Sequence, residues 1–211
     1  MRYLLIGILL LYQNFGFAQR VYSTKHDISE AQEIVFFGYD FGHFKLFEPK
    51  RLMEDGIKKN IPLWIDYLSA KEDEDFLKKK MRKNKIIFDF KYLTDIYHSL
   101  PESGLVSLSK CTIPVDSIQS IINNYQTSQK EGIGLTIIVE CFNKKIDASS
   151  AYFTFFDIST KKILMTDHYS TSNHASGLGL STYWGRAFEA TVYAYFDEEY
   201  KKNLKKNNCC I

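Results

Sequence analysis

The sequence predicts an α+β domain in which helices pack on a single mixed β-sheet. Apolar strand candidates alternate with helical segments in the first part of the chain, three strand candidates follow one another later, and an amphipathic helix comes last. These observations predict the order β-α-β-α-β-β-β-α in a two- or three-layer sandwich, because each apolar face must be covered by another element.

The expected strands are short and rich in β-forming residues. They are Glu33–Tyr39, Lys85–Phe90, Ile133–Phe142, Ala151–Ile158 and Ile163–Tyr169. The last two form a hairpin around the turn between them. In the third strand, alternation predicts that five side chains share one face. They are Ile133, Leu135, Ile137, Val139 and Cys141.

The expected helices lie between these strands and after them. Ile61–Lys83 looks helical in two pieces, and Ser69 with Glu72 matches a capping box at which the second piece would begin. Lys91–Leu100 is expected to be helical, and Pro114 is well placed to open a further helix. The segment 40–60 is expected to hold a loop and a short helix.

The final helix is expected over Thr182–Tyr200, and its apolar stripe is the clearest in the chain. The stripe consists of Trp184, Phe188, Thr191, Val192 and Tyr195, with Arg186, Glu189 and Asp197 lying off it. We expect Trp184, Phe188 and Tyr195 to be buried against the strands between residues 133 and 169.

The first eighteen residues have the layout of a secretion signal. Arg2 is followed by the uncharged apolar run Tyr3–Tyr12 and then by Gly16 and Ala18, the small residues that precede a cut after Ala18. The alternative is a retained anchor, but a membrane-spanning helix needs about 20 apolar residues. We therefore expect a signal peptide (1–18), a single domain (19–200), a basic tail (201–211) and a periplasmic or secreted location.

Composition excludes some classes of protein. Hydrophobic residues make up 45% and aromatic residues 15%, which argues against disorder. The net charge of only +2 argues against nucleic-acid binding. Beyond residue 18, no apolar run is long enough to span a membrane, so no transmembrane segment is expected after cleavage.

Four cysteines leave two interpretations open. Outside the cytoplasm, Cys111 and Cys141 can form a disulfide, or they can be two small buried hydrophobic residues. The pair Cys209 and Cys210 is equally undetermined. No C-x-x-C spacing is present, so a zinc site is not expected.

No motif for catalysis, cofactor binding or metal binding stands out. The segment Gly177–Ser181 lacks the third glycine of a dinucleotide loop, and a tight turn explains it better than an anion site. The histidine pairings nearest to a site are Asp40 with His43 and Asp167 with His168. His168 and His174 flank the same loop without a third ligand. We predict no catalytic, cofactor-binding or metal-binding residue and no cofactor.

Aromatic residues are concentrated in two segments. One holds Phe36, Phe37, Tyr39, Phe41, Phe44 and Phe47, and the other holds Tyr152, Phe153, Phe155 and Phe156. Such residues can line an apolar cavity, although they more often form the core.

The C-terminal third resembles a family of small secreted proteins of Gram-negative bacteria. The similar parts are the strand Tyr152–Asp157, the segment Thr160–Leu164, the pair Tyr183-Trp184 that leads the last helix, and the earlier segment Gly38–Phe41. The family has no assigned activity, so the resemblance implies no site residues. In fold alone, the chain is similar to TolB N-terminal and curli-secretion domains of the periplasm.

The function we expect is non-enzymatic binding of a cell-envelope protein partner. A small apolar-ligand carrier is the alternative, and a hydrolase without a recognisable motif is the third reading.

Overall fold

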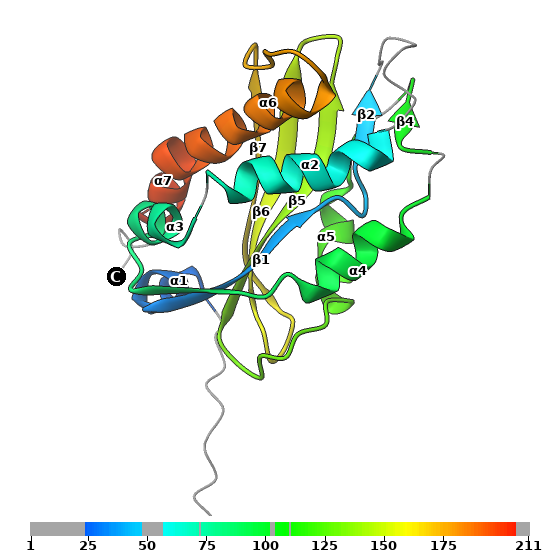
Figure 1. Cartoon of the computed structure of the whole chain (residues 1–211). Helices are drawn as coiled ribbons and strands as arrows, with labels where there is room; N and C mark the ends of the chain where they lie inside the picture. Colours follow the sequence, from blue (N-terminus) through cyan, green and yellow to red (C-terminus); the bar gives the residue numbers. More distant parts are fainter. Residues whose placement is uncertain (1–23, 48–56, 72, 102–103, 110, 206–211) are drawn as a thin grey trace, which may run out of the picture.

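The structure is a computed structural model that describes residues 24–47, 57–71, 73–101, 104–109 and 111–205 (Figure 1). The predicted signal peptide and the pair Cys209 and Cys210 lie outside these residues.

A seven-stranded mixed sheet forms the centre of the molecule. β5 (Ile133–Asn143) is its middle strand. On one side β5 pairs in parallel with β1 (Glu33–Asp40) and β2 (Lys45–Phe47), and on the other side it pairs antiparallel with β6 (Ala148–Asp157). The outer strands are β3 (Lys85–Phe88) beside β1, β4 (Val106–Ser107) beside β2, and β7 (Ile163–Ser172) beside β6.

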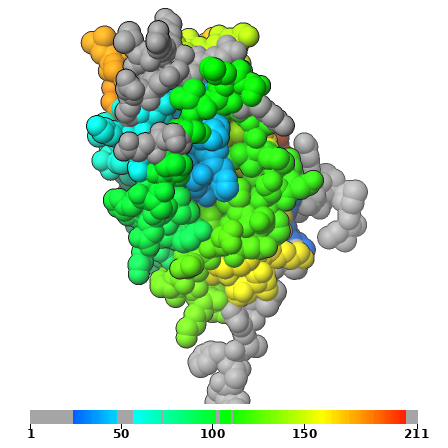
Figure 2. Space-filling view, turned by 90° about the vertical axis from the view of Figure 1, so that its right-hand side faces the viewer, coloured from blue at the N-terminus to red at the C-terminus, as the bar shows by residue number. Residues whose placement is uncertain are grey.

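Helices cover both faces of the sheet, so the architecture has three layers. Two of them, α2 (Ile57–Ser69) and α6 (Leu180–Ala194), cross one face in Figure 1 and bury its core. The same layer holds α1 (Lys25–Glu30), α3 (Glu74–Met81) and α7 (Tyr200–Lys205). The other face is packed by α4 (Lys91–Ser99) and α5 (Val115–Asn123), which both appear in green in Figure 2. The predicted α+β class and single mixed sheet are thereby confirmed.

Two expectations for the first half of the chain are wrong. The segment 40–60 contains the short strand β2, and α2 begins at Ile57. Ser69 is the last residue of α2 rather than the cap of the next helix. Asp73 caps α3, and its side chain accepts the backbone N–H of Phe76 at 2.9 Å. An aspartate satisfies this orphan donor as well as a serine does, so the cap lies four residues further on.

The predicted packing of the last helix is confirmed. Trp184, Phe188 and Tyr195 are all fully buried. The ring of Trp184 stacks on Phe142 of β5 with centroids 4.9 Å apart, and Tyr195 stacks on Phe153 of β6 at 3.7 Å.

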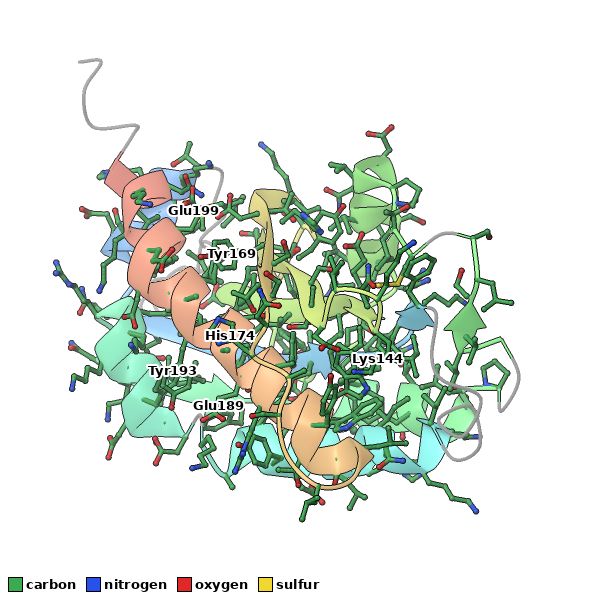
Figure 3. The ribbon with its side chains drawn as sticks, turned by 90° about the horizontal axis from the view of Figure 1, so that it is seen from above. Lys144, Tyr169, His174, Glu189, Tyr193 and Glu199 are labelled. Carbon is green, nitrogen blue, oxygen red and sulfur yellow. A yellow bond between two sulfur atoms is a disulfide. The ribbon has the colours of Figure 1, made fainter. Side chains whose placement is uncertain are left out.

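The last helix also contacts α2 and α3. Figure 3 shows Glu189 and Tyr193 on the side of α6 that faces these two helices. Glu189 accepts a hydrogen bond from Tyr67 at 2.8 Å, and Tyr193 packs on Phe76. Gly185 allows this approach, because a Cβ atom there would lie 2.9 Å from the Tyr67 ring.

A π-helical turn interrupts the end of this helix. The predicted helix over Thr182–Tyr200 is α6, then the π-turn Tyr195–Glu199, then α7. Helical structure therefore continues through Lys205, into the segment that was expected to be a tail.

A β-bulge changes the faces of β5 near its end. Opposite β6, Val139 pairs with Ala151 and Cys141 pairs with Ser150, so Glu140 is an extra residue. The predicted alternation holds from Ile133 to Val139 on the α6 side and fails at Cys141, because the bulge places Phe142 on that side instead. Glu140 and Cys141 both turn toward the segment that precedes α5.

None of the helices in the described ranges combines the length and the apolar character needed to cross a bilayer.

Candidate functional site

A surface hollow of about 400 Å³ lies beside the bulge of β5, and we call it the disulfide hollow. Its wall includes the Cys111–Cys141 bridge and the side chains of His168 and Ser170 from β7. Hydroxyl groups of Ser109, Thr112 and Ser150 also line it. The lining combines these polar residues with apolar surface from Phe47, Ile146 and Ala148, and its walls include parts of β5, β6, β7 and the segment before α5.

The disulfide fixes one wall of this hollow. Cys111 and Cys141 are bonded with their Cα atoms 5.7 Å apart, which decides between the two interpretations left open by the sequence. The bridge joins the segment before α5 to the bulge of β5. That segment then donates the backbone N–H of Ile113 to Glu140 at 2.8 Å.

Glu140 is the buried acid of the site, with only 5% of its side chain exposed. Besides the Ile113 N–H, one carboxylate oxygen receives the Ser150 hydroxyl at 2.7 Å and lies 2.6 Å from His168 Nε2. Burial alone raises the pKa of Glu140, but these hydrogen bonds outweigh it, so the pKa lies below its ordinary value.

His168 is the exposed partner of this buried acid. Its side chain is 44% exposed, and its ring packs on Tyr152 with centroids 4.7 Å apart. Glu140 holds Nε2, while Nδ1 has no hydrogen-bond partner among the described residues. A histidine oriented in this way can exchange a proton with a small molecule in the hollow.

The arrangement differs from a serine-hydrolase triad. The Ser150 hydroxyl bonds to Glu140 and not to His168, so the acid lies between the serine and the histidine. In a triad the histidine lies between the other two groups. The described residues therefore offer an oriented base without an activated hydroxyl.

The structure separates the other histidine pairings suggested by the sequence. Asp167 accepts a hydrogen bond from Tyr195 at 2.9 Å, so it does not orient its neighbour His168. Within the described ranges, no three His, Cys, Asp or Glu residues are placed to hold a metal ion, so His168 and His174 form no such group.

Asp40 lies in a separate buried network. It accepts hydrogen bonds from Tyr125 at 2.6 Å and from the backbone N–H of Gly42 at 2.7 Å. Burial raises the pKa of Asp40 despite both bonds and despite the nearby charge of His43, which is itself exposed. Among the described residues, the hydrogen bonds of this network lead to Tyr125, Thr136 and Gly42, none of which lines the disulfide hollow.

The glycine segment 177–181 forms the turn into α6. Gly177 and Gly179 have φ angles of +124° and +84°, which favour glycine, and Leu178 between them is 96% exposed. This geometry agrees with the interpretation as a tight loop.

Sequence reasoning missed Glu140, although a signal for it is visible. It is the one charged residue in the strand Ile133–Phe142, and a buried acid requires partners. Those partners, Ile113 and His168, lie 27 and 28 residues away along the chain.

Replacing Glu140 with glutamine should make the protein less stable at neutral pH but not in acid. The lowered pKa means that ionised Glu140 stabilises the folded state above about pH 4.5. This contribution disappears as the pH falls through the folded-state pKa. We expect Glu140→Gln to lower the free energy of unfolding by about 1–3 kcal/mol at pH 7, because a buried acceptor becomes a donor.

Urea denaturation at pH 7 and at pH 3.5 measures this effect, and the gap between variant and wild type should narrow at the lower pH. Asp75→Asn is the control, since the Asp75 side chain is 90% exposed. A gap of equal size at both pH values would contradict the expectation.

No family model matches this sequence, and no curated protein matches it.

Proposed function

We propose that this protein is a secreted or periplasmic, non-enzymatic domain that binds a protein of the cell envelope through the open edge of β7. An extended segment of the partner would add to the sheet as a further strand, with main-chain hydrogen bonds supplying the affinity. The observation that supports this most directly is the length and openness of that edge.

β7 is ten residues long, and within the described residues it pairs only with β6. From Thr166 to Ser172, no residue of the strand is buried. The opposite edge is different, because β3 has four residues and starts at Lys85, and β4 has two. The edge formed by β7 is thus much longer than the opposite edge formed by β3 and β4.

The composition of β7 also favours pairing. Proteins usually protect an exposed edge with lysine, proline, a bulge or a very short strand. β7 has one bulge near its start, at Leu164, but from Met165 to Ser172 it pairs regularly with β6 and contains neither lysine nor proline. Its last three residues are serine or threonine. Its one carboxylate, Asp167, is engaged by Tyr195.

Two features support a location outside the cytoplasm. Residues 1–18 have the layout of a signal peptide, and the Cys111–Cys141 disulfide is of a kind that persists in oxidising compartments. The resemblance to small secreted proteins of Gram-negative bacteria agrees with both.

A pair of proline substitutions tests whether a partner strand pairs with the edge of β7. Successive N–H groups of a strand point to opposite sides, so one of Ser170 and Thr171 donates toward β6 and the other donates outward. We expect one of Ser170→Pro and Thr171→Pro to unfold at a lower temperature. The other should melt like the wild type and fail to retain the partner in affinity capture from envelope extracts.

A photo-crosslinking residue at position 170 identifies what contacts the edge, and the same residue at Lys79 on α3 serves as the control. A specific adduct from position 170 alone is the expected result. If the stable proline variant captures the same proteins as the wild type, strand addition at β7 is wrong.

A second candidate function is hydrolysis of a small polar substrate with His168 as general base. It is favoured by the Glu140–His168 pair and by the disulfide hollow in front of it. Loss of turnover in His168→Gln, across a panel of small esters, would support it. Equal turnover in variant and wild type would exclude His168 from the chemistry.

The carrier alternative has weaker support. Phe36 and Tyr39 line a hollow of about 230 Å³. Pockets for drug-sized ligands measure about 300–1,000 Å³, so this hollow has room only for a very small apolar molecule. The other rings of the two aromatic segments pack largely on one another and on Trp64 and Trp184.

A further inference from the structure

A second hollow, of about 260 Å³, lies where α1, α3 and α7 meet, and we call it the basic hollow. Figure 1 shows these three helices gathered at one end of the helical layer. Four cationic side chains line it, namely Lys80, Arg82, Lys83 and Lys201. This concentration of positively charged side chains in one hollow is unusual for a chain whose net charge is only +2.

Only part of this charge is neutralised locally. Asp197 binds Lys80 at 2.6 Å and lies 3.9 Å from Lys201. Glu30 lies near Lys83, and its negative charge favours the charged form of the Lys83 ammonium group. The guanidinium of Arg82 has no ion-pair or hydrogen-bond partner in the described part of the chain. Four cations therefore face two carboxylates.

Lys83 shows how enclosed this hollow is. The residue is only 6% exposed, and its ammonium group donates to the backbone carbonyls of Ile28 and Ser29 at the end of α1. Burial lowers the pKa of Lys83 to about 8. A buried ammonium without a carboxylate in contact is stabilised when an anion binds nearby.

Tyr200 provides an independent sign of a missing partner. The residue is 2% exposed and lines the hollow, yet its buried hydroxyl has no hydrogen-bond partner among the described residues. Buried hydroxyls are nearly always paired, so an unpaired one on a residue that lines a cavity points to an acceptor that the described residues do not supply. Met81 and Leu204 complete the wall with apolar surface.

We propose that the basic hollow binds a small amphiphilic anion, with a phosphate or carboxylate head and a short apolar body. Arg82 and Lys83 hold the head, since a guanidinium pairs with these groups through two parallel hydrogen bonds. Tyr200 donates its hydroxyl to the same head. The apolar body lies against Met81 and Leu204, and the volume limits it to a few carbon atoms.

The backbone at Arg82 is consistent with this role. Arg82 caps α3 in the left-handed conformation, with φ 56° and ψ 51°. This conformation is costly for a side chain other than glycine, asparagine or aspartate. The conformational cost at Arg82 is offset when its guanidinium group is required for binding at the basic hollow.

Calorimetric titration of the purified protein with butyl phosphate tests the site, with inorganic phosphate as the second probe. We expect saturable binding of butyl phosphate that is tighter than that of inorganic phosphate. Arg82→Gln and Tyr200→Phe should each weaken it about tenfold, as the loss of a hydrogen bond to a charged group does.

Tyr200→Phe is the decisive variant, because it removes a hydroxyl that has no hydrogen-bond partner in the described part of the chain. Its melting temperature should equal or exceed that of the wild type while its affinity falls. Lys79→Gln is the matched control, since Lys79 is an exposed lysine of the same helix that does not line the hollow.

Absence of saturable binding would overturn the proposal, as would wild-type affinity in Tyr200→Phe or equal weakening by Lys79→Gln. Vesicles of phosphatidylcholine with and without phosphatidylglycerol distinguish the two sources of the anion. Arg82-dependent binding to the anionic vesicles assigns the site to a lipid head group, and binding of butyl phosphate alone assigns it to a free small molecule.

Discussion

Trp184→Ala is expected to lower the free energy of unfolding by about 3–5 kcal/mol, as large-to-small changes of a buried aromatic do. Trp184 is fully buried, stacks on Phe142 and meets the edge of Tyr183. Because a domain of this size is stabilised by only about 5–15 kcal/mol, the variant should be poorly folded at 37 °C. Thermal and urea denaturation followed by far-UV circular dichroism measures the loss.

Two further variants make this result specific. Leu178→Ala removes a large apolar side chain that is 96% exposed just before α6, so it should change stability by less than about 0.5 kcal/mol. Trp184→Phe should cost less than alanine, because the buried indole N–H has no partner among the described residues. If Trp184→Ala melted like the wild type, α6 would not be docked on β5 as described.

Removal of the disulfide is expected to cost about 3–4 kcal/mol, the chain-entropy value for a loop of this length. Cys111 and Cys141 are 30 residues apart in sequence, and the bridge restricts the unfolded chain across that span. The double variant Cys111→Ala/Cys141→Ala also frees the segment that donates Ile113 N–H to Glu140. The loss is measured by urea denaturation.

Reductant provides the internal control for the disulfide. Dithiothreitol should lower the urea midpoint of the wild type and leave that of the double variant unchanged. Cys209→Ser/Cys210→Ser should respond to reductant like the wild type. A wild-type midpoint that does not change with dithiothreitol would contradict this expectation.

The long elements of this fold are predictable because each carries its own periodicity. β1, β5, β6 and β7 lie within a few residues of their expected positions, and the stripe that begins at Trp184 is buried as its spacing requires. β2 and β4 are different, since strands of three and two residues have no period to detect. Their pairing depends on β5 and on each other.

The disulfide hollow was not predictable, and the reason lies in the bulge. An alternating pattern assumes a regular strand, so it assigned Cys141 to the face of Val139 and gave Glu140 no role. One extra residue in β5 reverses both assignments. The partner His168 comes from another strand, and no local pattern connects the two. Of the site, the sequence indicated that Cys111 and Cys141 were candidates for a bridge and that His168 was a candidate site histidine, but it paired His168 with Asp167 and not with Glu140.

The π-turn at Tyr195–Glu199 has a consequence for how this chain can vary. In an α-helix, the position after Tyr195 that faces the core would be Glu199, four residues on. Here the backbone N–H of Tyr200 bonds to the carbonyl of Tyr195, so the inward position passes to Tyr200, five residues on. Deleting one residue between them would place Tyr200 four residues after Tyr195, the inward position of a regular α-helix, so the π-turn would become α-helical and every later side chain would keep its face. A homologue one residue shorter in this turn would therefore carry the same residues at the wall where α7 meets α1, and the wall would change only with a change of length inside α7 itself.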